Sequence, residues 1–298
     1  MGNTDGMRLD IGPLGIWTAV LDAHPAAQAQ EAAQELEELG FATLWIPEAV
    51  GREPFVQAAN LLSATSRLRL ATGIANIYAR DAMTMRAAQN TLAEAYPNRF
   101  LLGIGVSHSH LVARVRKHSY EKPLSYMRQY LDDMDNSLFM AVGPAEPPPR
   151  VLAALGPKML ELAAARASGA HPYFTTPDHT ATARSTLGPD PLLAPEQMIV
   201  LDTDPTRARE KARQGMAVYL RAPNYLNNLA RLGFSESDWS DGGNDRLVDA
   251  IVAWGDLGAV AARVKAHRDA GADHVCLQVL RGDAELPLAE WRELATLI

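Results

Sequence analysis

Ionisable side chains follow two apolar runs in the first half of the chain, close to where those runs end. Glu48 follows Leu44–Ile46, and His108 follows Phe100–Val106. A carboxylate can bind or protonate a ligand, and an imidazole exchanges protons near neutral pH without extreme tuning of its pKa. We therefore predict His108 as the acid–base group of a reaction centre, with Glu48 assisting it. A surface carboxylate paired with Arg52 is the alternative for Glu48.

A second set of residues could bind a flat ring and an anion. In Thr72–Asn76 a glycine follows an apolar run, and glycine permits unusual backbone angles and close approach to a ring. Leu155–Lys158 joins an apolar run to a helix, so backbone N–H groups and the lysine ammonium could bind a phosphate there. The hydroxyls of Thr175 and Thr176 could contact the same anion or cap a helix. A simple turn is the alternative for Leu155–Lys158.

Two familiar motifs are incomplete in this chain. His108, His110 and His118 have no nearby carboxylate or cysteine that would complete a zinc site, so we predict no metal. Gly103–Gly105 has the spacing of part of a dinucleotide fingerprint, but the third glycine and a helix directly after it are missing. The sequence therefore does not predict a Rossmann motif.

Apolar runs alternate with amphipathic segments along most of the chain. Between Pro25 and Gly40, alanines and a leucine recur at the i, i+3, i+4, i+7 spacing of one helical face. Pro54–Ala64 is helical in composition, and Asp81 is placed to cap a further helix. The runs predicted as strands are Leu9–Trp17, Leu44–Ile46, Leu68–Ile74, Phe100–Val106, Val151–Leu155, His171–Thr175, Met198–Asp202 and Val275–Leu280.

Eight strands joined by helices favour a closed (β/α)8 barrel, with residues 1–298 as a single domain. An open doubly wound sheet with a helical appendage has the same local pattern and is the alternative. Ser107–Lys122 and Ala222–Asn244 interrupt the alternation, and we predict them to be long loops inserted at the carboxyl ends of the strands. Ligand-binding residues of such barrels lie at that end.

Composition limits the classes of partner. The chain has 28 Lys and Arg against 35 Asp and Glu, a net charge of −7, which argues against general nucleic-acid binding. No apolar run approaches the roughly 20 residues of a membrane-spanning helix. Cys276 is the only cysteine, so no internal disulfide can form, and we expect a cytoplasmic protein that acts on a small molecule.

Five segments together resemble a known family in their order and spacing. They are Gly40–Glu48, Leu70–Ile74, Arg99–Ser107, Gly156–Ala163 and Ala272–Val275. They resemble the luciferase-like monooxygenase superfamily over nearly the whole chain. Within it, the chain is most similar to the branch that depends on coenzyme F420, a deazaflavin, rather than to the branch that uses FMN and oxygen.

The resemblance implies which residues bind the cofactor. At a backbone bulge, often with a non-prolyl cis peptide, the bent deazaflavin would be supported by Gly73, Ile74, Ala75 and Asn76. The cofactor's phosphate would be cradled by Ala154, Leu155, Gly156, Pro157, Lys158, Thr175 and Thr176. The resemblance also implies a homodimer.

One departure from the family concerns the substrate. Glucose-6-phosphate dehydrogenases of this kind carry an Asp-His pair after the second strand and a glutamate after the fourth, where this chain has Glu48-Ala49 and His108. Because Ala49 cannot transfer a proton, a sugar-phosphate substrate is not implied. The expected activity is hydride transfer between F420 and a small organic substrate. An FMN-dependent monooxygenase and a non-catalytic ligand-binding barrel are the alternatives.

Overall fold

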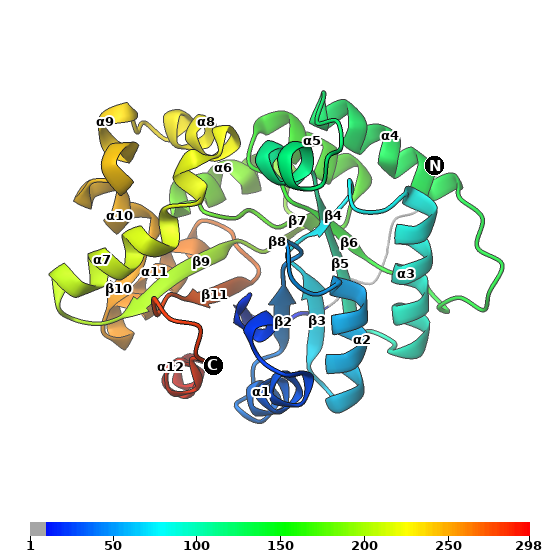
Figure 1. The fold of residues 1–298 in the computed structure, drawn as a ribbon, viewed down its shortest axis with the longest axis horizontal. Helices are drawn as coiled ribbons and strands as arrows, with labels where there is room; N and C mark the ends of the chain where they lie inside the picture. The colour runs from blue at the N-terminus through cyan, green and yellow to red at the C-terminus, as the bar shows by residue number, and fades with distance from the viewer. Residues whose placement is uncertain (1–9) are drawn as a thin grey trace.

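A parallel β-sheet that curls into a barrel forms the centre of the molecule (Figure 1). The structure is a computed structural model and describes residues 10–298. Leu9, the first residue of the first predicted strand, lies outside the described residues. The barrel strands are β1 (Leu14–Trp17), β2 (Thr43–Ile46), β3 (Arg69–Thr72), β5 (Phe100–Gly105), β6 (Arg150–Leu152), β7 (Gly169–Ala170), β8 (Leu192–Leu193), β9 (Glu196–Leu201) and β11 (Val275–Val279).

One continuous segment closes the ring of strands. β8 pairs with β7, β9 pairs with β11, and only Ala194 and Pro195 lie between β8 and β9. β11 in turn pairs with β1, and every pairing in the ring is parallel. Because β8 and β9 occupy one strand position, eight positions complete the barrel, and the predicted (β/α)8 class is confirmed.

Two short strands lie outside the ring. β4 (Ala75–Asn76) pairs with β5 and continues the direction of β3 beyond the Gly73–Ile74 peptide. β10 (Ala253–Gly255) pairs with β9 at the edge of the sheet. β10 is not among the predicted strands, because three residues are too few to show a periodic pattern.

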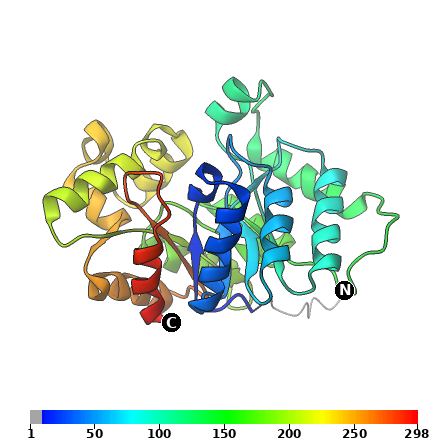
Figure 2. The same cartoon turned by 60° about the horizontal axis from the view of Figure 1, so that its bottom comes forward.

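Helices cover the outside of the barrel (Figures 1 and 2). The predicted apolar face between Ala29 and Leu36 is buried, and Asp81 Oδ1 caps its helix by accepting from Thr84 N at 2.8 Å. No helix within residues 10–298 is long and apolar enough to cross a lipid bilayer. The helices are α1 (Ala26–Glu38), α2 (Pro54–Ala64), α3 (Ala82–Ala95), α4 (Pro123–Asn136), α5 (Pro157–Arg166), α6 (Pro177–Leu187), α7 (Pro205–Met216), α8 (Pro223–Arg231), α9 (Glu236–Trp239), α10 (Asp245–Ile251), α11 (Leu257–Asp269) and α12 (Leu288–Leu294), with single turns at η1 (Val20–Ala23), η2 (His110–Val115), η3 (Tyr219–Arg221), η4 (Ser240–Gly242) and η5 (Ala295–Leu297).

The two predicted long loops are partly helical. Ser107–Lys122 contains η2, a π-helical turn, and Ala222–Asn244 contains α8 and α9. Most residues of α8 are polar and its buried face is short, so the sequence pattern predicts a loop for this segment instead of a helix. The arrows of β2 and β3 point to the top of Figure 1, where α8 and α9 lie. The first insertion follows the carboxyl end of β5 directly, as predicted, whereas the second follows α7 and places α8 against His108 at that same end of the barrel.

The prediction of a strand at His171–Thr175 is wrong, because the strand at this place is β7, which ends at Ala170. A Cβ at Gly169 would lie 2.0 Å from the Leu192 carbonyl oxygen, so the close approach of β7 to β8 requires glycine. Phe174 has a φ of 55°, which is a left-handed conformation that strands do not contain. The segment therefore forms a loop that crosses the end of β7.

Buried histidines inside the barrel are uncharged. Trp45 Nε1 donates to His274 Nε2 at 3.1 Å, and His274 Nδ1 donates to the Gly12 carbonyl oxygen at 2.7 Å. His171 stacks on Trp45 with ring centroids 4.3 Å apart, and its Nδ1 donates to the Ala194 carbonyl oxygen at 2.7 Å. Burial lowers the pKa of both histidines to about 4. His171 and His274 are therefore neutral at pH 7.

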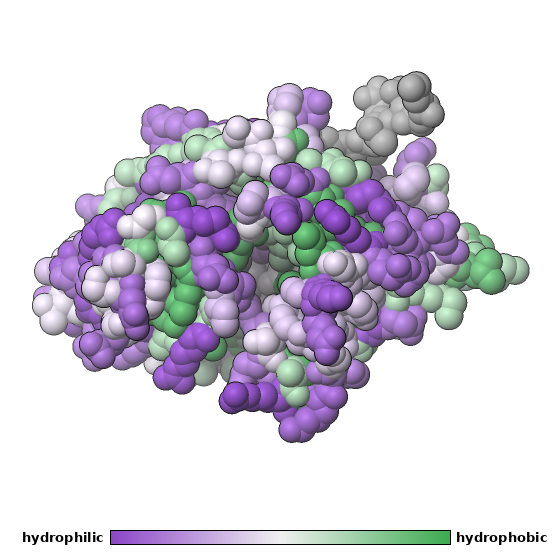
Figure 3. Space-filling model, turned by 90° about the horizontal axis from the view of Figure 1, so that it is seen from above, coloured by the Kyte–Doolittle hydropathy of each residue, from purple (hydrophilic) through white to green (hydrophobic). Residues whose placement is uncertain are grey.

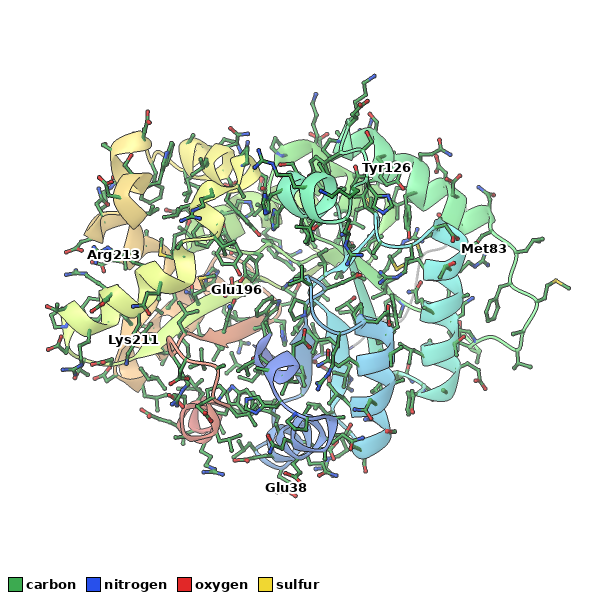
Figure 4. All side chains as sticks on the ribbon, viewed as in Figure 1. Glu38, Met83, Tyr126, Glu196, Lys211 and Arg213 are labelled. Atoms are coloured by element: carbon green, nitrogen blue, oxygen red, sulfur yellow. The ribbon has the colours of Figure 1, made fainter. Side chains whose placement is uncertain are left out.

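Glu196, at the start of β9, is a buried acid near the middle of the molecule (Figure 4). Its Oε2 accepts from Phe174 N at 3.2 Å, and its Oε1 has no hydrogen-bond partner among the described residues. Burial raises the pKa of Glu196 to about 8, and the bond from Phe174 opposes that rise only in part. The carboxyl group is therefore protonated at pH 7.

Replacing the acid by its neutral amide tests this protonation state. In an unfolded chain a glutamate has a pKa of about 4.3, so Glu196 contributes stability that is complete below that pH and is lost as the pH rises towards 8. The loss is about 1.4 kcal/mol per pH unit in the free energy of unfolding. We expect Glu196→Gln to abolish this loss between pH 5 and 8 in urea unfolding curves. The surface control Glu38→Gln should follow the wild type (Figure 4). Identical pH profiles for wild type and Glu196→Gln would contradict the assignment.

Candidate functional site

The segment between β3 and β4 lies at the mouth of the barrel and carries the predicted bulge. The Gly73–Ile74 peptide bond is cis, the backbone feature that the resemblance implied. Trp17 Nε1, at the end of β1, donates to the Gly73 carbonyl oxygen at 3.0 Å. A Cβ at Gly73 would lie 2.6 Å from Trp17 Nε1 and 3.0 Å from His171 Nε2. Glycine is therefore required at Gly73, because the barrel interior packs directly against it.

The two glycines of β5 make room for this segment. A Cβ at Gly103 would lie 2.0 Å from the Thr72 carbonyl oxygen, and a Cβ at Gly105 would lie 2.6 Å from Ile74 Cγ1. Gly103–Gly105 thus has a packing role, which agrees with the prediction that it is not a nucleotide fingerprint. The bulge is supported from the β5 side by close backbone contact.

Glu48 connects the bulge to two neighbouring loops. Its carboxylate accepts from Asn76 N at 2.8 Å, from both terminal nitrogens of Arg80 at 2.8 Å, and from Arg116 Nη2 at 3.1 Å. Its own N–H donates to the Ile74 carbonyl oxygen at 3.3 Å. The side chain is 6% exposed. Because both oxygens are occupied by protein donors, the geometry supports a positioning role for Glu48 and not the predicted contact with a ligand.

His108 lies in the loop after β5, against the start of α8. Its Nδ1 is 3.3 Å from Asn224 Oδ1, and its ring centroid is 5.3 Å from that of Tyr225. Burial lowers the pKa of His108, and the bond to Asn224 opposes the shift. Since Nδ1 carries the proton donated to Asn224, Nε2 of the neutral ring has a free lone pair and can accept a proton.

The other histidines of this loop do not join His108. His110 and His118 are exposed. Within residues 10–298 no three side chains of the His, Cys, Asp and Glu types come together in a way that could hold a metal ion.

The predicted phosphate cradle is formed by the starts of α5 and α6. Gly156 is the N-cap of α5, and Lys158 is exposed in its first turn. Thr176 is the N-cap of α6, where its hydroxyl accepts from His179 N at 3.4 Å. His179 Nε2 donates to the Leu155 carbonyl oxygen at 2.8 Å, which ties α6 to the start of α5. The helix N-termini and Lys158 therefore lie on neighbouring elements, whereas Thr176 serves as a cap.

Of the remaining predicted cradle residues, Ala154 and Thr175 are buried, Leu155 is half-buried and Pro157 is exposed. β6 ends at Leu152, three residues before the end of the predicted strand Val151–Leu155, and the following residues form the turn into α5. Ala154 and Thr175 are 2% and 1% exposed, and the Thr175 hydroxyl has no hydrogen-bond partner among the described residues. Pro157 occupies the first position of α5, so it contributes no N–H donor.

Sequence reasoning missed three polar residues beside this cradle. A Cβ on Gly156 would lie 3.7 Å from Arg231 Nη2, which places the α8 guanidinium over the start of α5. Arg231 donates to Asn228 Oδ1 at 3.3 Å. Asn228 Nδ2 and His179 Nδ1 are buried without partners in the described part of the chain. An asparagine on the apolar side of α8 is the one sequence signal that could have indicated this site.

The charges around the cradle suit an anion. Two helix N-termini, Lys158 and Arg231 are all positive, and Arg231 forms no ion pair with another described residue. Burial lowers the pKa of His179, and the positive charge of Arg231 lowers it further. Thr175 Oγ1 and Asn228 Nδ2 are buried donors with hydrogen-bonding capacity left over, whereas the neutral ring of His179, whose proton lies on Nε2, can only accept at Nδ1. The residues present therefore fit a phosphate group.

Aromatic side chains occupy the other side of the barrel mouth. We call Trp17, Tyr173, Phe174, Tyr219 and Tyr225 the aromatic cluster. Seen from above, the molecule is hollowed near the middle of this face, with apolar as well as polar side chains at the rim (Figure 3). The mouth therefore combines the bulge, His108, the predicted phosphate cradle and the aromatic cluster.

Comparison with solved structures shows the same fold in deazaflavin-dependent enzymes. An F420-dependent secondary alcohol dehydrogenase, in complex with an F420–acetone adduct, has a TM-score of 0.78 and 15% identity, over 96% of this chain and 98% of that one. A coenzyme F420-dependent tetrahydromethanopterin reductase from Methanopyrus kandleri has a TM-score of 0.75 and 17% identity, over 95% and 96% of the two chains. At these identities the likeness shows the fold alone.

Comparison of sequences shows the family. A putative coenzyme F420-dependent oxidoreductase of Mycobacterium tuberculosis is 32% identical over 127 residues, which are 43% of this chain. The match spans about a third (35%) of the length of that protein. The model of the luciferase-like monooxygenase family matches residues 13–274, which include the bulge, His108 and both cradle helices. The chain belongs to the luciferase-like monooxygenase family.

Proposed function

We propose that this protein is a coenzyme F420-dependent oxidoreductase that transfers a hydride to or from a small organic substrate. The observation that carries the proposal is the convergence of unpartnered buried polar atoms, Arg231 and two helix N-termini beside the backbone bulge. The partial relative and the two solved structures support F420 as the cofactor, while FMN remains the cofactor of the competing hypothesis.

The phosphate of the cofactor would lie between the starts of α5 and α6. Arg231 and Lys158 would supply positive charge, and the α5 N-terminus would supply backbone N–H groups. The backbone of residues 73–76 would support the ring, with Asn76 fixed from behind by Glu48. Bound F420 supplies the hydride donor or acceptor.

His108 would move the proton that accompanies hydride transfer. Its Nδ1 proton is committed to Asn224, so Nε2 is the atom that exchanges a proton with the substrate. A neutral imidazole can accept a proton in an oxidation and return it in a reduction. Glu48 would act on the reaction only through the positions of Asn76 and Arg116.

Titration of the purified protein tests the cofactor. We expect oxidised F420 to quench tryptophan fluorescence with micromolar affinity and FMN to bind more weakly. Arg231→Gln should weaken F420 binding by about 10- to 100-fold, since a hydrogen bond to a charged group contributes about 1.5 to 3 kcal/mol. The control Arg292→Gln removes an exposed arginine that pairs with Glu35 and should bind F420 as the wild type does.

Other results of this titration identify the competing hypotheses. Preference for FMN, with oxygen uptake on addition of reduced FMN, would replace hydride transfer by oxygenation. Binding of neither cofactor would favour a ligand-binding barrel without redox activity. Undiminished F420 binding by Arg231→Gln would show that the cofactor phosphate lies elsewhere.

Replacing His108 tests proton transfer separately from binding. We expect His108→Asn to lower kcat about 10²- to 10⁴-fold, the usual contribution of a general acid or base, and to leave the F420 dissociation constant within about twofold. His118→Asn, an exposed histidine of the same loop, is the matched control. Unchanged turnover in the His108 variant would remove it from the mechanism.

A further inference from the structure

The aromatic cluster is continuous from the bulge to α8. The ring centroids of Trp17 and Tyr173 are 5.1 Å apart, and those of Tyr173 and Tyr219 are also 5.1 Å apart. Tyr225 on α8 lies 5.4 Å from Tyr219 and 5.2 Å from Phe174. Because Trp17 also bonds to the bulge, the cluster lies beside the place proposed for the cofactor ring.

The polar atoms of the cluster bond to neutral partners. Tyr173 and Tyr219 share a hydrogen bond of 2.6 Å between their hydroxyls, and the Tyr173 hydroxyl donates to Gln278 Oε1 at 2.7 Å. Trp17 Nε1 bonds to a backbone carbonyl. Among the described residues, no side chain of Lys, Arg, Asp or Glu hydrogen-bonds to these rings, and no cation stacks on them.

The titratable groups around the cluster are uncharged near neutral pH. Burial raises the pKa of Tyr219 to about 12, and it also raises the pKa values of Tyr173 and Tyr225 well above their ordinary range. Glu196, whose charge would act on all three tyrosines, is protonated at pH 7 because burial raises its pKa to about 8. His108 is neutral because burial lowers its pKa.

The arginines of the barrel mouth contact groups outside the aromatic cluster. Arg80 and Arg116 bond to Glu48, and Arg231 lies over the start of α5. An anionic substrate in the cluster would lose its hydration without meeting a cation, which is a large free-energy cost. An uncharged body would pack on the rings. Tyr173 donates to Gln278 and Tyr219 donates to Tyr173, so the Tyr219 oxygen could accept a hydrogen bond from a hydroxyl of that body other than the reacting one.

We infer that the substrate is an uncharged molecule with a flat or ring-shaped apolar body and at least one alcohol or carbonyl group, and that phosphorylated and carboxylated molecules are excluded. This inference rests on the proposed function for its redox step. In the oxidation, the C–H bond at the alcohol carbon would break and its hydride, with both electrons, would pass to oxidised F420. The hydroxyl proton passes to Nε2 of His108, and the product is an aldehyde or ketone.

A matched pair of probes tests the exclusion of anions. Benzene-1,4-dimethanol and 4-(hydroxymethyl)benzoate share a ring and a primary alcohol and differ in one charged group. Saturation-transfer NMR should show at least tenfold tighter binding of the diol, both with and without F420. Equal or tighter binding of the carboxylate would overturn the inference. Failure of the proposed function is a different result, since F420 binding is measured separately and the probe preference is read in either state.

Variants locate the preference at the cluster. Tyr219→Phe removes the hydroxyl that pairs with Tyr173 and should weaken diol binding about fivefold, the usual effect of one neutral hydrogen bond. Tyr96→Phe, at the end of α3, is the matched control and should leave diol binding unchanged. Unchanged diol binding by a folded Tyr219→Phe protein would place the substrate outside the cluster. If that variant does not fold, the probe preference of the wild type still decides.

Discussion

A carboxylate that bonds only to protein partners fixes the mouth of this barrel. Glu48 follows β2, accepts from the backbone of β4 at Asn76, and pairs with Arg80 before α3 and with Arg116 after η2. Three loops that are distant in sequence thereby meet at one side chain. A buried carboxylate must be fully hydrogen-bonded to be tolerated, so the position of each loop depends on the others. The position of the bulge that would support the cofactor ring therefore depends on the hydrogen bonds of Glu48.

Charge divides the remainder of the mouth into two regions. At the starts of α5 and α6, positive helix ends and Arg231 meet buried polar atoms that lack partners. Around the aromatic cluster, burial keeps Tyr219, Glu196 and His108 uncharged at pH 7. A cofactor with a phosphate on one side and a substrate without charge on the other would match this division. The α8 insertion contributes to both regions, because it carries Arg231 as well as Tyr225.

The sequence predicted the barrel and the residues at its strand ends, because burial of a parallel strand on both faces leaves a readable apolar run. It predicted the turn into α5 for the same reason. It could not predict β7, where two small residues are enough because Gly169 packs against a carbonyl of β8. The positioning role of Glu48 could not be predicted either, because its pairing with Arg116 depends on the path of a 16-residue insertion rather than on local spacing. Arg231 and Asn228 were missed because only the fold brings α8 over the start of α5.

The central claim is that the barrel mouth binds the phosphate of F420 at α5 and α6 and its ring at the bulge. A structure from crystals soaked with oxidised F420 tests this claim most directly. The account predicts the phosphate of F420 between the starts of α5 and α6, within hydrogen-bond distance of Arg231, and the deazaflavin ring against the backbone of Gly73 to Asn76. The ring should lie between that backbone and the aromatic cluster. A phosphate bound away from α5, or a ring outside the barrel mouth, would contradict the account.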